Sequence, residues 1–391
     1  MEWVIKPLGE LVTFERGLTY SKSDEAEFSS NGVLRSNNVD LETNSLNLDE
    51  IKYLKADFVI PSSKKVVRNS LLMCMSNGSK SHLGKVALIE DDLGYAFGGF
   101  MGLLKPIDTV VLPRYLYYSL ISPAYKKHIQ SLSDGANINN LKYKDLSVFP
   151  VMLPTSLSEQ QRIVDILDAE FAKIDALKEN AEKNLQNAKD LFQAVLRKEL
   201  EPKDGWTTSK FVDVVRIING RAYNKSELLS QGKYQVLRVG NFFTNDSWYY
   251  SDLELDPDKY CDKGDLLYAW SASFGPKIWM GEKTIYHYHI WKLDHSEVLN
   301  RKYLYHWLQS RYLTSQVMSN LHGTTMAHIT KGIMESTNIA YPSYDEQCRI
   351  ADVIDHIFEK CNTLLENYNT TFKLCDDLKQ ASLRKAFNGE L

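Results

Sequence analysis

The histidines, cysteines and glycine-rich segments are the parts of this sequence most able to support metal binding or catalysis. His287 and His289 lie two positions apart, the spacing that would place two metal ligands on one face of a strand. No third ligand is evident, and residues 286–291 are more simply an alternating strand with its polar side chains directed outward. The five cysteines are widely spaced and form no CxxC pair, which favours buried thiols over a disulfide framework or a zinc site.

Two glycine-rich segments match nucleotide-binding loops only in part. Five residues, instead of four, separate Gly78 from Gly84, and Val86 follows Lys85 where a phosphate-binding loop requires serine or threonine. Residues 97–102 precede a predicted strand and do not open a helix, which favours a bulged strand over a methyl-donor or dinucleotide site. The motifs of an amino-methyltransferase and of a carboxylate-dependent nuclease are also missing. The sequence therefore predicts no catalytic residue, no metal site and no cofactor in this chain.

Three short polar segments carry side chains that suit contacts with DNA, and each segment occurs twice. Arg, Lys, Asn, Ser and Thr bind phosphates and base edges, and small neighbours let the backbone approach closely. Taken alone, each segment is equally well explained as a hairpin or a helix cap, but a divergent recognition surface on a repeated framework would produce three such pairs. The candidate DNA-binding residues are Arg35, Asn37, Asn38, Ser76, Asn77, Ser79, Lys80, Asn137 and Asn139 in the first copy, and Arg238, Asn241, Ser271, Ser273, Lys277, Thr324, Thr325 and His328 in the second.

These polar segments lie within an internal repeat whose two copies keep a nearly constant offset. Trp3 returns 203 positions later as Trp206. The segment Glu-Gln-x-Arg-Ile at 159–163 returns at 346–350, 187 positions later, so the first copy carries small insertions. A repeat of this length determines the architecture. It predicts a globular unit at 1–153, a helix at 154–201, a second globular unit at 202–342 and a second helix at 343–391.

Apolar residues in both helical segments recur alternately every three and four positions, which is a heptad pattern. A helix over residues 158–200 would be about 60 Å long at the standard rise, and one helix cannot bury such a stripe alone. We therefore expect the two helices to pack as an antiparallel coiled coil with the globular units at its opposite ends. The predicted helix–helix contact residues are Ile163, Leu167, Ile174, Leu177, Leu191 and Val195 in the first helix, and Ile350, Ile354, Ile357, Leu364 and Leu378 in the second.

The globular segments are predicted to be rich in strands. Short β-branched or aromatic runs bounded by Gly, Asn, Ser and Asp indicate strands. The expected fold class is α+β, with two β-rich domains related by pseudo-two-fold symmetry and separated by two long antiparallel coiled-coil helices. We predict strands at 71–75, 85–89, 236–239, 265–270 and 285–292, and helices at 113–132 and 300–321.

Length and composition are those of an ordinary folded protein. With 391 residues, 43% of them apolar, disorder is excluded as the main state. No apolar run approaches the roughly 18 residues of a membrane span, and the first residues lack the pattern of a secretion signal, so we expect a cytoplasmic protein without a membrane partner. The net charge of −4 arises from an acidic excess in the helical segments. The globular segments are neutral or slightly basic, which permits a DNA-binding face on each.

The residues that join each globular unit to its helix resemble those of the specificity subunit of type I restriction-modification systems. The resemblance covers essentially the whole chain. It rests on the alternation of unit and helix, on Leu-Pro…Ser-Glu-Gln-Gln-Arg-Ile-Val at 153–164 and its counterpart at 341–350, on Gly-Lys-Val at 84–86, and on the ending Leu-Arg-Lys-Ala-Phe-Asn-Gly-Glu-Leu. The departures are Cys348 in place of a second glutamine and the polar residues Tyr368, Thr371 and Ser382 in the second helix, and they concern how tightly that helix packs.

The resemblance implies a non-catalytic chain with two target-recognition domains, each of which binds one half of a bipartite, asymmetric target in double-stranded DNA. The paired helices would act as a spacer and as a docking surface for two methyltransferase subunits, with restriction subunits as optional partners. S-adenosylmethionine, ATP and Mg²⁺ would be bound by those partners, which would methylate adenine, translocate DNA and cleave it. Lys85, Lys142 and Lys331 then join Lys80 and Lys277 as candidate DNA contacts.

Two other functions remain open from the sequence. The chain could be a stand-alone sequence-specific DNA-binding adaptor, which would bind one duplex tightly at physiological salt without other subunits. It could also be a self-contained modification enzyme, but such an enzyme would need the catalytic motifs that this sequence lacks.

Overall fold

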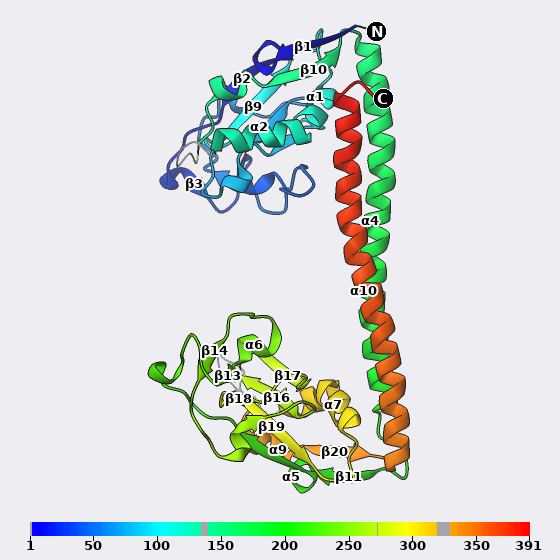
Figure 1. Cartoon of the computed structure of the whole chain (residues 1–391). Coiled ribbons are helices and arrows are strands. Elements are labelled where there is room, and N and C mark those ends of the chain that lie inside the picture. Colours follow the sequence, from blue (N-terminus) through cyan, green and yellow to red (C-terminus); the bar gives the residue numbers. More distant parts are fainter. Residues whose placement is uncertain (1, 134–139, 272, 319–328) are drawn as a thin grey trace. The chain divides into compact units, whose positions relative to one another are not determined.

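The structure of the chain, a computed structural model, describes residues 2–133, 140–271, 273–318 and 329–391. It consists of two compact units (Figure 1). Unit 1 contains Met1–Ala181 and Thr370–Leu391, and unit 2 contains Glu182–Asn369. Each unit therefore combines one globular part with portions of both long helices.

The globular part of unit 1 is built from short strands and three helices before α4 (Leu157–Glu199). The strands are β1 (Trp3–Pro7), β2 (Val12–Arg16), β3 (Glu25–Ala26), β4 (Asn31–Leu34), β5 (Lys52–Leu54), β6 (Leu71–Cys74), β7 (Val86–Leu88), β8 (Ala96–Phe97), β9 (Met101–Pro106) and β10 (Pro150–Pro154). The helices are α1 (Pro113–Ser119), α2 (Pro123–Ser133) and α3 (Tyr143–Leu146). The strands pair in the orders β1-β10, β2-β9-β6-β7 and β3-β5-β4-β8.

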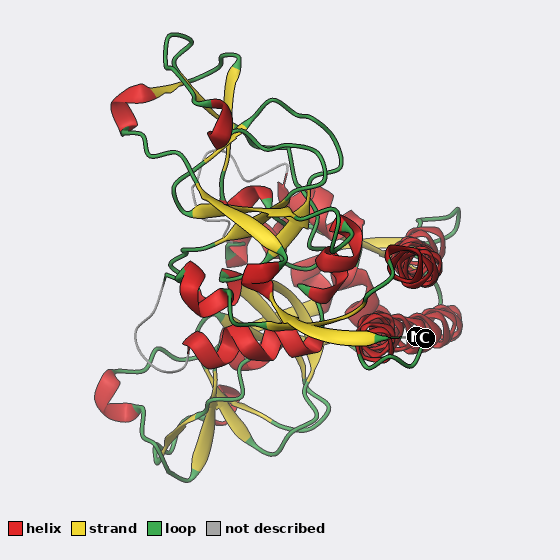
Figure 2. Ribbon diagram, turned by 90° about the horizontal axis from the view of Figure 1, so that it is seen from above, coloured by secondary structure: helices red, strands yellow, loops and turns green. Residues whose placement is uncertain are grey.

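The globular part of unit 2 repeats this plan and precedes α10 (Tyr344–Phe387). Its strands are β11 (Thr207–Lys210), β12 (Val215–Asn219), β13 (Tyr234–Leu237), β14 (Tyr249–Ser251), β15 (Tyr260–Cys261), β16 (Leu266–Ser271), β17 (Ser273–Ile278), β18 (Thr284–Tyr286), β19 (Ile290–His295) and β20 (Asn338–Tyr341). Its helices are α5 (Phe211–Val214), α6 (Val239–Phe243), α7 (Arg301–Gln309), α8 (Arg311–Met318) and α9 (Lys331–Ser336). The strand orders are β11-β20, β12-β19-β16-β17 and β14-β13-β18-β15, so that strands, short helices and loops mix as the α+β class predicts (Figure 2).

The strand orders confirm the internal repeat, because β2-β9-β6-β7 matches β12-β19-β16-β17 and β5-β4-β8 matches β14-β13-β18. The latter two sheets differ at one edge strand, which is β3 beside β5 in unit 1 and β15 beside β18 in unit 2. In each unit one sheet contains a parallel pair, β4 with β8 in unit 1 and β13 with β18 in unit 2. Leu34 lies opposite Phe97 in the first pair, and Leu237 lies opposite Tyr286 in the second. Because the pairing has the same register, each residue near these strands has a definite counterpart in the other unit.

The strand and helix predictions are confirmed in position but not in every boundary. Residues 71–75 and 85–89 contain β6 and β7, and 265–270 cover β16 except for its last residue. Residues 236–239 cover only the last two residues of β13, because α6 begins at Val239. The strand predicted at 285–292 is wrong in its middle, because β18 ends at Tyr286 and β19 begins at Ile290. The predicted helices at 113–132 and 300–321 are each divided into two, α1 with α2 and α7 with α8.

The long helices are part of the core of each unit. In unit 1 the buried cluster that covers the sheet β2-β9-β6-β7 includes Leu167 of α4 and Leu383 of α10. In unit 2 the corresponding cluster includes Leu196 of α4 and Ile354 of α10. Four of the five cysteines are buried free thiols, and Cys348 is half-buried. Neither globular part therefore buries its apolar surface without the helices.

A buried glutamine fixes each globular part to its long helix. In unit 1 the side chain of Gln160 accepts from the Leu112 amide at 2.8 Å and donates to the carbonyls of Val110 and Pro154, both at 3.0 Å. In unit 2, Gln347 makes the equivalent three bonds, with the Asn300 amide at 2.8 Å and with the carbonyls of Val298 and Pro342 at 2.9 and 3.0 Å. Both glutamines are fully buried. The repeated Glu-Gln-x-Arg-Ile segment thus has a structural role.

A second repeated contact differs in chemistry between the units. In unit 1, Asp168 of α4 accepts from the Arg114 guanidinium at 2.7 Å and from the Tyr118 hydroxyl. The counterparts in unit 2 are Asp355 on α10, Lys302 and His306, with the His306 ring nitrogen Nε2 2.7 Å from the carboxylate. His306 is buried, and burial lowers its pKa, while Asp355 partly offsets that effect. Unit 2 therefore has a histidine, whose ordinary pKa is near neutral, where unit 1 has a tyrosine, whose ordinary pKa is about 10.

The contacts within unit 1 show that α4 and α10 are antiparallel. Lys178 lies 3.9 Å from Asp376, and Asp175, one turn earlier on α4, pairs with Lys379 further along α10. The same direction is found in unit 2, where Ala188, Phe192 and Glu199, in this order along α4, contact Cys361, Phe358 and Arg349, which run backwards along α10. The predicted antiparallel pairing is confirmed in both units (Figure 1).

One row of the residues predicted at the helix–helix interface is buried, and the other row is displaced by one residue. Ile163, Leu167, Ile174, Ile350 and Ile354 are buried, and Val195 and Ile357 are partly buried. The placement of the other four leucines in the interface is wrong: Leu177, Leu191, Leu364 and Leu378 are 55%, 50%, 39% and 51% exposed. Their next neighbours are less exposed instead, namely Lys178, Phe192, Leu365 and Lys379.

The displacement follows from helix geometry. Positions three and four residues after a buried contact both lie near the seam, so an apolar pattern alone does not choose between them. In the folded pair, Phe192 meets Phe358, and the Lys379 ammonium lies 5.1 Å from the centre of the Phe171 ring. The aromatic rings and the aliphatic stems of the lysines cover more of the seam than the leucines would.

Replacing Gln160 with alanine should destabilise unit 1. The Leu112 amide and the Val110 and Pro154 carbonyls would lose their partner, and a buried polar group left unpaired costs about 1–3 kcal/mol. We expect a lower melting temperature in calorimetry. The control is Gln161→Ala, because Gln161 is exposed and its amide donates to Asp165 on the helix surface. Equal melting temperatures for the two variants would contradict the anchoring role of Gln160.

Unit 2 should lose stability as the pH falls below about 6.5, the ordinary pKa of histidine. The folded-state pKa of His306 is lowered by burial, so the unfolded chain binds the proton more readily, and the stability present above the unfolded pKa is lost on acidification. His306→Tyr, which installs the residue found in unit 1, should reduce the acid sensitivity. Melting curves between pH 7.5 and 5.5 measure this. His356→Gln, on the exposed face of α10, is the control, and an unchanged pH profile for His306→Tyr would refute the assignment.

Candidate nucleic-acid interface

In unit 1 the first two predicted polar segments meet at one cavity of about 950 Å³. Arg35 and Asn37 reach it from the residues after β4, and Ser76 and Asn77 reach it from the residues after β6. The two segments are adjacent because β4 and β6 lie in sheets that pack on a shared apolar cluster containing Leu34 and Leu72. The predicted residues Arg35, Asn37, Ser76 and Asn77 are therefore brought together, although about 40 positions separate them in the sequence.

Arg35 combines partial burial with an unpaired nitrogen. Its backbone amide donates to the Asn38 side chain at 2.8 Å, which fixes the turn that follows β4. Its Nε atom is buried and has no hydrogen-bond partner within the described part of the chain. A buried polar atom without a partner is costly. Arg35 therefore lines the cavity with one buried donor of its guanidinium unsatisfied.

Asn38 is buried, although the sequence predicted it to contact DNA. It is 1% exposed, and its amide nitrogen donates to the carbonyls of Asn47 and Glu50, both at 2.9 Å. With its oxygen bonded to the Arg35 amide, the side chain has no surface left for DNA. The prediction of a direct contact by Asn38 is wrong, because the residue shapes the turn that carries Arg35.

The second polar segment is tied to the first through side chains. The Asn77 amide donates to the Ser36 hydroxyl at 2.6 Å, and the buried Cys74 thiol lies 3.5 Å from the same hydroxyl. Asn77 also accepts from the Ser79 amide at 2.9 Å. These bonds hold the two segments in one arrangement, so the wall of the cavity is pre-organised.

In unit 2 the corresponding cavity measures about 490 Å³ and lies at the end of β13. Arg238 and Asn241, the counterparts of Arg35 and Asn38, both line it, together with Tyr249, His287 and His289. The Arg238 guanidinium lies over the Tyr249 ring at 5.3 Å, a cation–π contact that orients it. Predicted residues of the first segment therefore line equivalent cavities in both units.

Asn241 and the second polar segment of unit 2 contribute differently. The Asn241 amide donates to the carbonyls of Asn245 and Ser247 at 2.9 and 2.7 Å, which closes the loop at the cavity rim. Ser271 is buried and Ser273 is exposed, and neither lines the cavity. The segment after β16 thus does not repeat the contribution of Ser76 and Asn77 in unit 1.

Three of the predicted lysines already donate to backbone carbonyls inside the protein. Lys85, a predicted DNA contact, is 7% exposed at the wall of the unit 1 cavity, and its ammonium donates to the Val39 carbonyl at 2.6 Å. Lys277 donates to Phe242 at 2.6 Å, and Lys331 donates to the Ile217 carbonyl at 3.1 Å. Lys80 and Lys142 are exposed, as is Ser79. Asn137, Asn139, Thr324, Thr325 and His328 lie outside the described residues.

Sequence reasoning missed the aromatic and imidazole side chains of both cavities. Tyr20, His82 and Phe100 line the cavity of unit 1, and Phe100 is 71% exposed. Tyr249, His287 and His289 line that of unit 2. Exposed aromatic residues beside basic ones are a signal for nucleic-acid contacts, but alternation in the sequence assigned His287 and His289 to a continuous strand that the structure interrupts.

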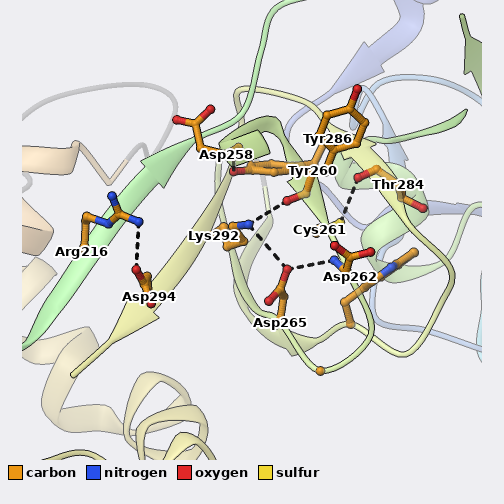
Figure 3. Close-up of polar contacts among 12 residues, drawn as sticks. Arg216, Asp258, Tyr260, Cys261, Asp262, Asp265, Thr284, Tyr286, Lys292 and Asp294 are labelled. Atoms are coloured by element: carbon orange, nitrogen blue, oxygen red, sulfur yellow. Dashed lines mark hydrogen bonds and ion pairs between the residues drawn. The ribbon is translucent and has the colours of Figure 1, made fainter. Parts of the chain in front are cut away.

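A separate group of charged residues in unit 2 is used within the fold. Lys292 donates to the Tyr260 carbonyl at 2.8 Å and lies 3.7 Å from the Asp265 carboxylate, and Arg216 pairs with Asp294 at 2.9 Å (Figure 3). These pairings neutralise the carboxylates. Among the residues that the structure describes, no set of three or more His, Cys, Asp or Glu is placed to hold a metal ion. The same residues contain no helix that is long and apolar enough to span a membrane.

Comparison with known sequences gives a family match over both copies of the repeat. The family described as the type I restriction modification DNA specificity domain matches residues 1–187 and 203–372. The chain is 25% identical over 422 residues to the type I restriction enzyme StySPI specificity subunit of Salmonella potsdam. It is 27% identical over 427 residues to the EcoKI specificity subunit of Escherichia coli strain K12. Both alignments cover 100% of this chain and 89% of the relative.

Solved structures share the fold. One, described as concerning complex assembly and conformational transition of the type I R-M system, has a TM-score of 0.81 at 19% identity and covers 100% of this chain and 98% of its own. The HsdS subunit from Thermoanaerobacter tengcongensis has a TM-score of 0.60 at 20% identity, with coverage of 100% and 97%. At these identities the likeness concerns the fold alone.

Proposed function

Because this chain belongs to the type I restriction modification DNA specificity family, we propose that each of its globular units recognises one half of a bipartite, asymmetric sequence in double-stranded DNA. The observation that carries the proposal is the pair of equivalent cavities, each formed after the parallel strand of its unit and each lined by an arginine, Arg35 or Arg238. The framework is repeated while the other lining side chains differ. A reader of two unlike half-sites requires this combination.

The chemistry of the cavities fits base recognition. Arginine donates two hydrogen bonds to the acceptors of guanine in the major groove, and one such bidentate contact provides about 1–3 kcal/mol of discrimination. Asn37, Ser76 and Asn77 add donors and acceptors in unit 1. The exposed Ser79, Lys80, Lys142 and Ser273 are suited to phosphates, which position a protein on DNA without specifying sequence.

The specificity subunit is the non-catalytic member of its complex, and we assign the chemistry to other subunits. S-adenosylmethionine, ATP and Mg²⁺ would be bound by methyltransferase and restriction subunits in the cytoplasm. The functional segments we propose are a recognition domain at 1–153, a spacer helix at 154–201, a second recognition domain at 202–342 and a second spacer helix at 343–391. The helices would set the separation of the half-sites, because half-site spacing follows the geometry of a two-fold reader.

The exposed leucines of the long helices suit the docking of two identical partners. Leu177 and Leu378 lie in unit 1, and their repeat counterparts Leu364 and Leu191 lie in unit 2. An apolar residue of a coiled coil gains free energy when a partner covers it. With one leucine pair in each unit, the chain would have one docking site for each of two methyltransferase subunits.

A stand-alone DNA-binding adaptor is the alternative function. It requires that the isolated chain bind one duplex tightly at physiological salt, whereas a specificity subunit acts together with its methyltransferase partners. Binding affinities must be compared at a fixed salt concentration, because phosphate contacts alone give strong binding at low salt.

Each arginine variant should change recognition of a different half-site. Arg35→Ala and Arg238→Ala, assembled with the methyltransferase subunits, should each lower methylation of the cognate sequence roughly tenfold to a hundredfold, the equivalent of about 1–3 kcal/mol. Mapping of methylated adenines in a duplex library gives the affected bases. Arg216→Ala, which removes an exposed ion pair, is the control. Loss of discrimination in the same half for both variants, or methylation that does not depend on this chain, would overturn the proposal.

The leucine pair of unit 1 should control partner stoichiometry. We expect Leu177→Ser with Leu378→Ser to reduce the complex from two methyltransferase subunits to one, as measured by native mass spectrometry, because the apolar contact in unit 2 remains. The control combines Lys173→Ser with Lys373→Ser, two exposed positions on the same helices. Retention of both partners at the wild-type affinity would disprove the docking assignment.

A further inference from the structure

One turn has the same backbone in both units. Residues 98–100 connect β8 to β9, and residues 287–289 connect β18 to β19. The first amide of the turn donates to the carbonyl of Leu34 in unit 1 and of Leu237 in unit 2, both at 2.9 Å. A side chain at Gly17 or Gly220 would come within 1.9 or 2.3 Å of the turn's first carbonyl oxygen. Glycine at both positions allows the same close approach, so the turn is held in one place in each unit.

The side chains on this turn are unlike in the two units. Unit 1 has Gly98, Gly99 and Phe100, and unit 2 has His287, Tyr288 and His289. All three residues of unit 1 line its cavity of about 950 Å³, and both histidines line the smaller cavity of unit 2 beside Arg238. The turn therefore lies at the wall of each candidate recognition cavity, where unit 1 presents backbone and a phenyl ring and unit 2 presents two imidazoles.

We propose that this turn determines half-site specificity, with His287 and His289 recognising base edges in the half-site of unit 2 and Phe100 making an apolar or stacking contact in the half-site of unit 1. The inference rests on the proposed function and adds to it the residues that make the two half-sites different. It goes beyond the arginines, because those are shared by the two units and cannot by themselves distinguish one half-site from the other.

The turn of unit 2 is held rigidly enough to select a base. Trp270 of β16, which occupies the position of Met75 in unit 1, donates its indole N–H to the Tyr288 carbonyl at 2.8 Å. Its ring centre lies 5.2 Å from that of His289 in an edge-on arrangement. The His287 and His289 rings are 4.9 Å apart. These contacts fix the imidazoles before DNA binds, which reduces the ordering cost of recognition.

The protonation state supports the same role. Burial lowers the pKa of His287 to about 4, with further repulsion from His289 and Arg238. The imidazole is therefore neutral at pH 7 and offers one donor and one acceptor, whereas the neighbouring guanidinium of Arg238 only donates. His287 and Arg238 together complement a base edge that carries both hydrogen-bond donors and acceptors. Each base pair presents a distinct pattern of these groups in the major groove.

The experiment transfers the turn of unit 1 to unit 2 in the full chain, assembled with its methyltransferase subunits. The variant combines His287→Gly, Tyr288→Gly and His289→Phe. Its methylated sites in a randomised duplex library are compared with those of the wild-type complex and of Arg216→Ala, the control in unit 2. We expect at least a tenfold loss of discrimination at one or more bases of one half-site, with the other half-site unchanged. The reciprocal variant, Phe100→His, should alter only that other half-site.

The outcomes separate this inference from the proposed function. If the wild-type complex methylates no bipartite sequence, the proposed function fails. If it does so and the transferred turn leaves both half-sites unchanged, the function stands and the assignment of the turn is wrong. If the triple variant does not assemble, the single substitutions His287→Asn and His289→Gln, which preserve size and polarity, provide the same readout, and an unaltered target for both overturns the inference.

Discussion

The structure depends on the fact that a heptad helix cannot bury its apolar stripe alone. Within each unit α4 and α10 meet in antiparallel orientation, and their buried residues merge with the core of the globular part, as Leu167 and Leu383 do in unit 1. The globular part is then fixed to the helix pair by the three hydrogen bonds of Gln160 or Gln347. Sheet, short helices and long helices therefore form one cooperative body in each unit, and the cavity wall is built on that body.

Burial distinguishes the residues that support the fold from those that line the cavities. Residues that hold the turns in place, such as Gly17, Gly220 and Asn38, are packed against backbone, where a change of size or polarity is costly. The Phe100 side chain on the cavity wall is 71% exposed and carries no such constraint. One fold can therefore present different chemistry in its two copies while the hydrogen bonds beneath stay the same.

Two equivalent contacts between a globular part and a long helix differ in their response to pH. Asp168 and Asp355 occupy equivalent places on the long helices, but the first bonds a tyrosine and the second a buried histidine. Both pairs join a globular part to a helix. The His306 partner gives unit 2 a group whose ordinary pKa lies near neutral pH and is lowered on folding, because desolvation disfavours the charged imidazole.

The sequence by itself determined the repeat, the two heptad helices, the α+β class and the family resemblance, because periodicity and the spacing of Glu-Gln-x-Arg-Ile are local properties of the chain. It also singled out Arg35 and Arg238, which line the two cavities. Tertiary structure decided which of two adjacent residues, such as Leu177 or Lys178, lies in the helix–helix interface. Both positions are near the interface, and the side chains of the facing helix determine which one packs there. It likewise decided that Asn38 and Lys85 are internal and that His287 and His289 face a cavity, because burial and hydrogen-bond partners arise from segments far apart in the chain.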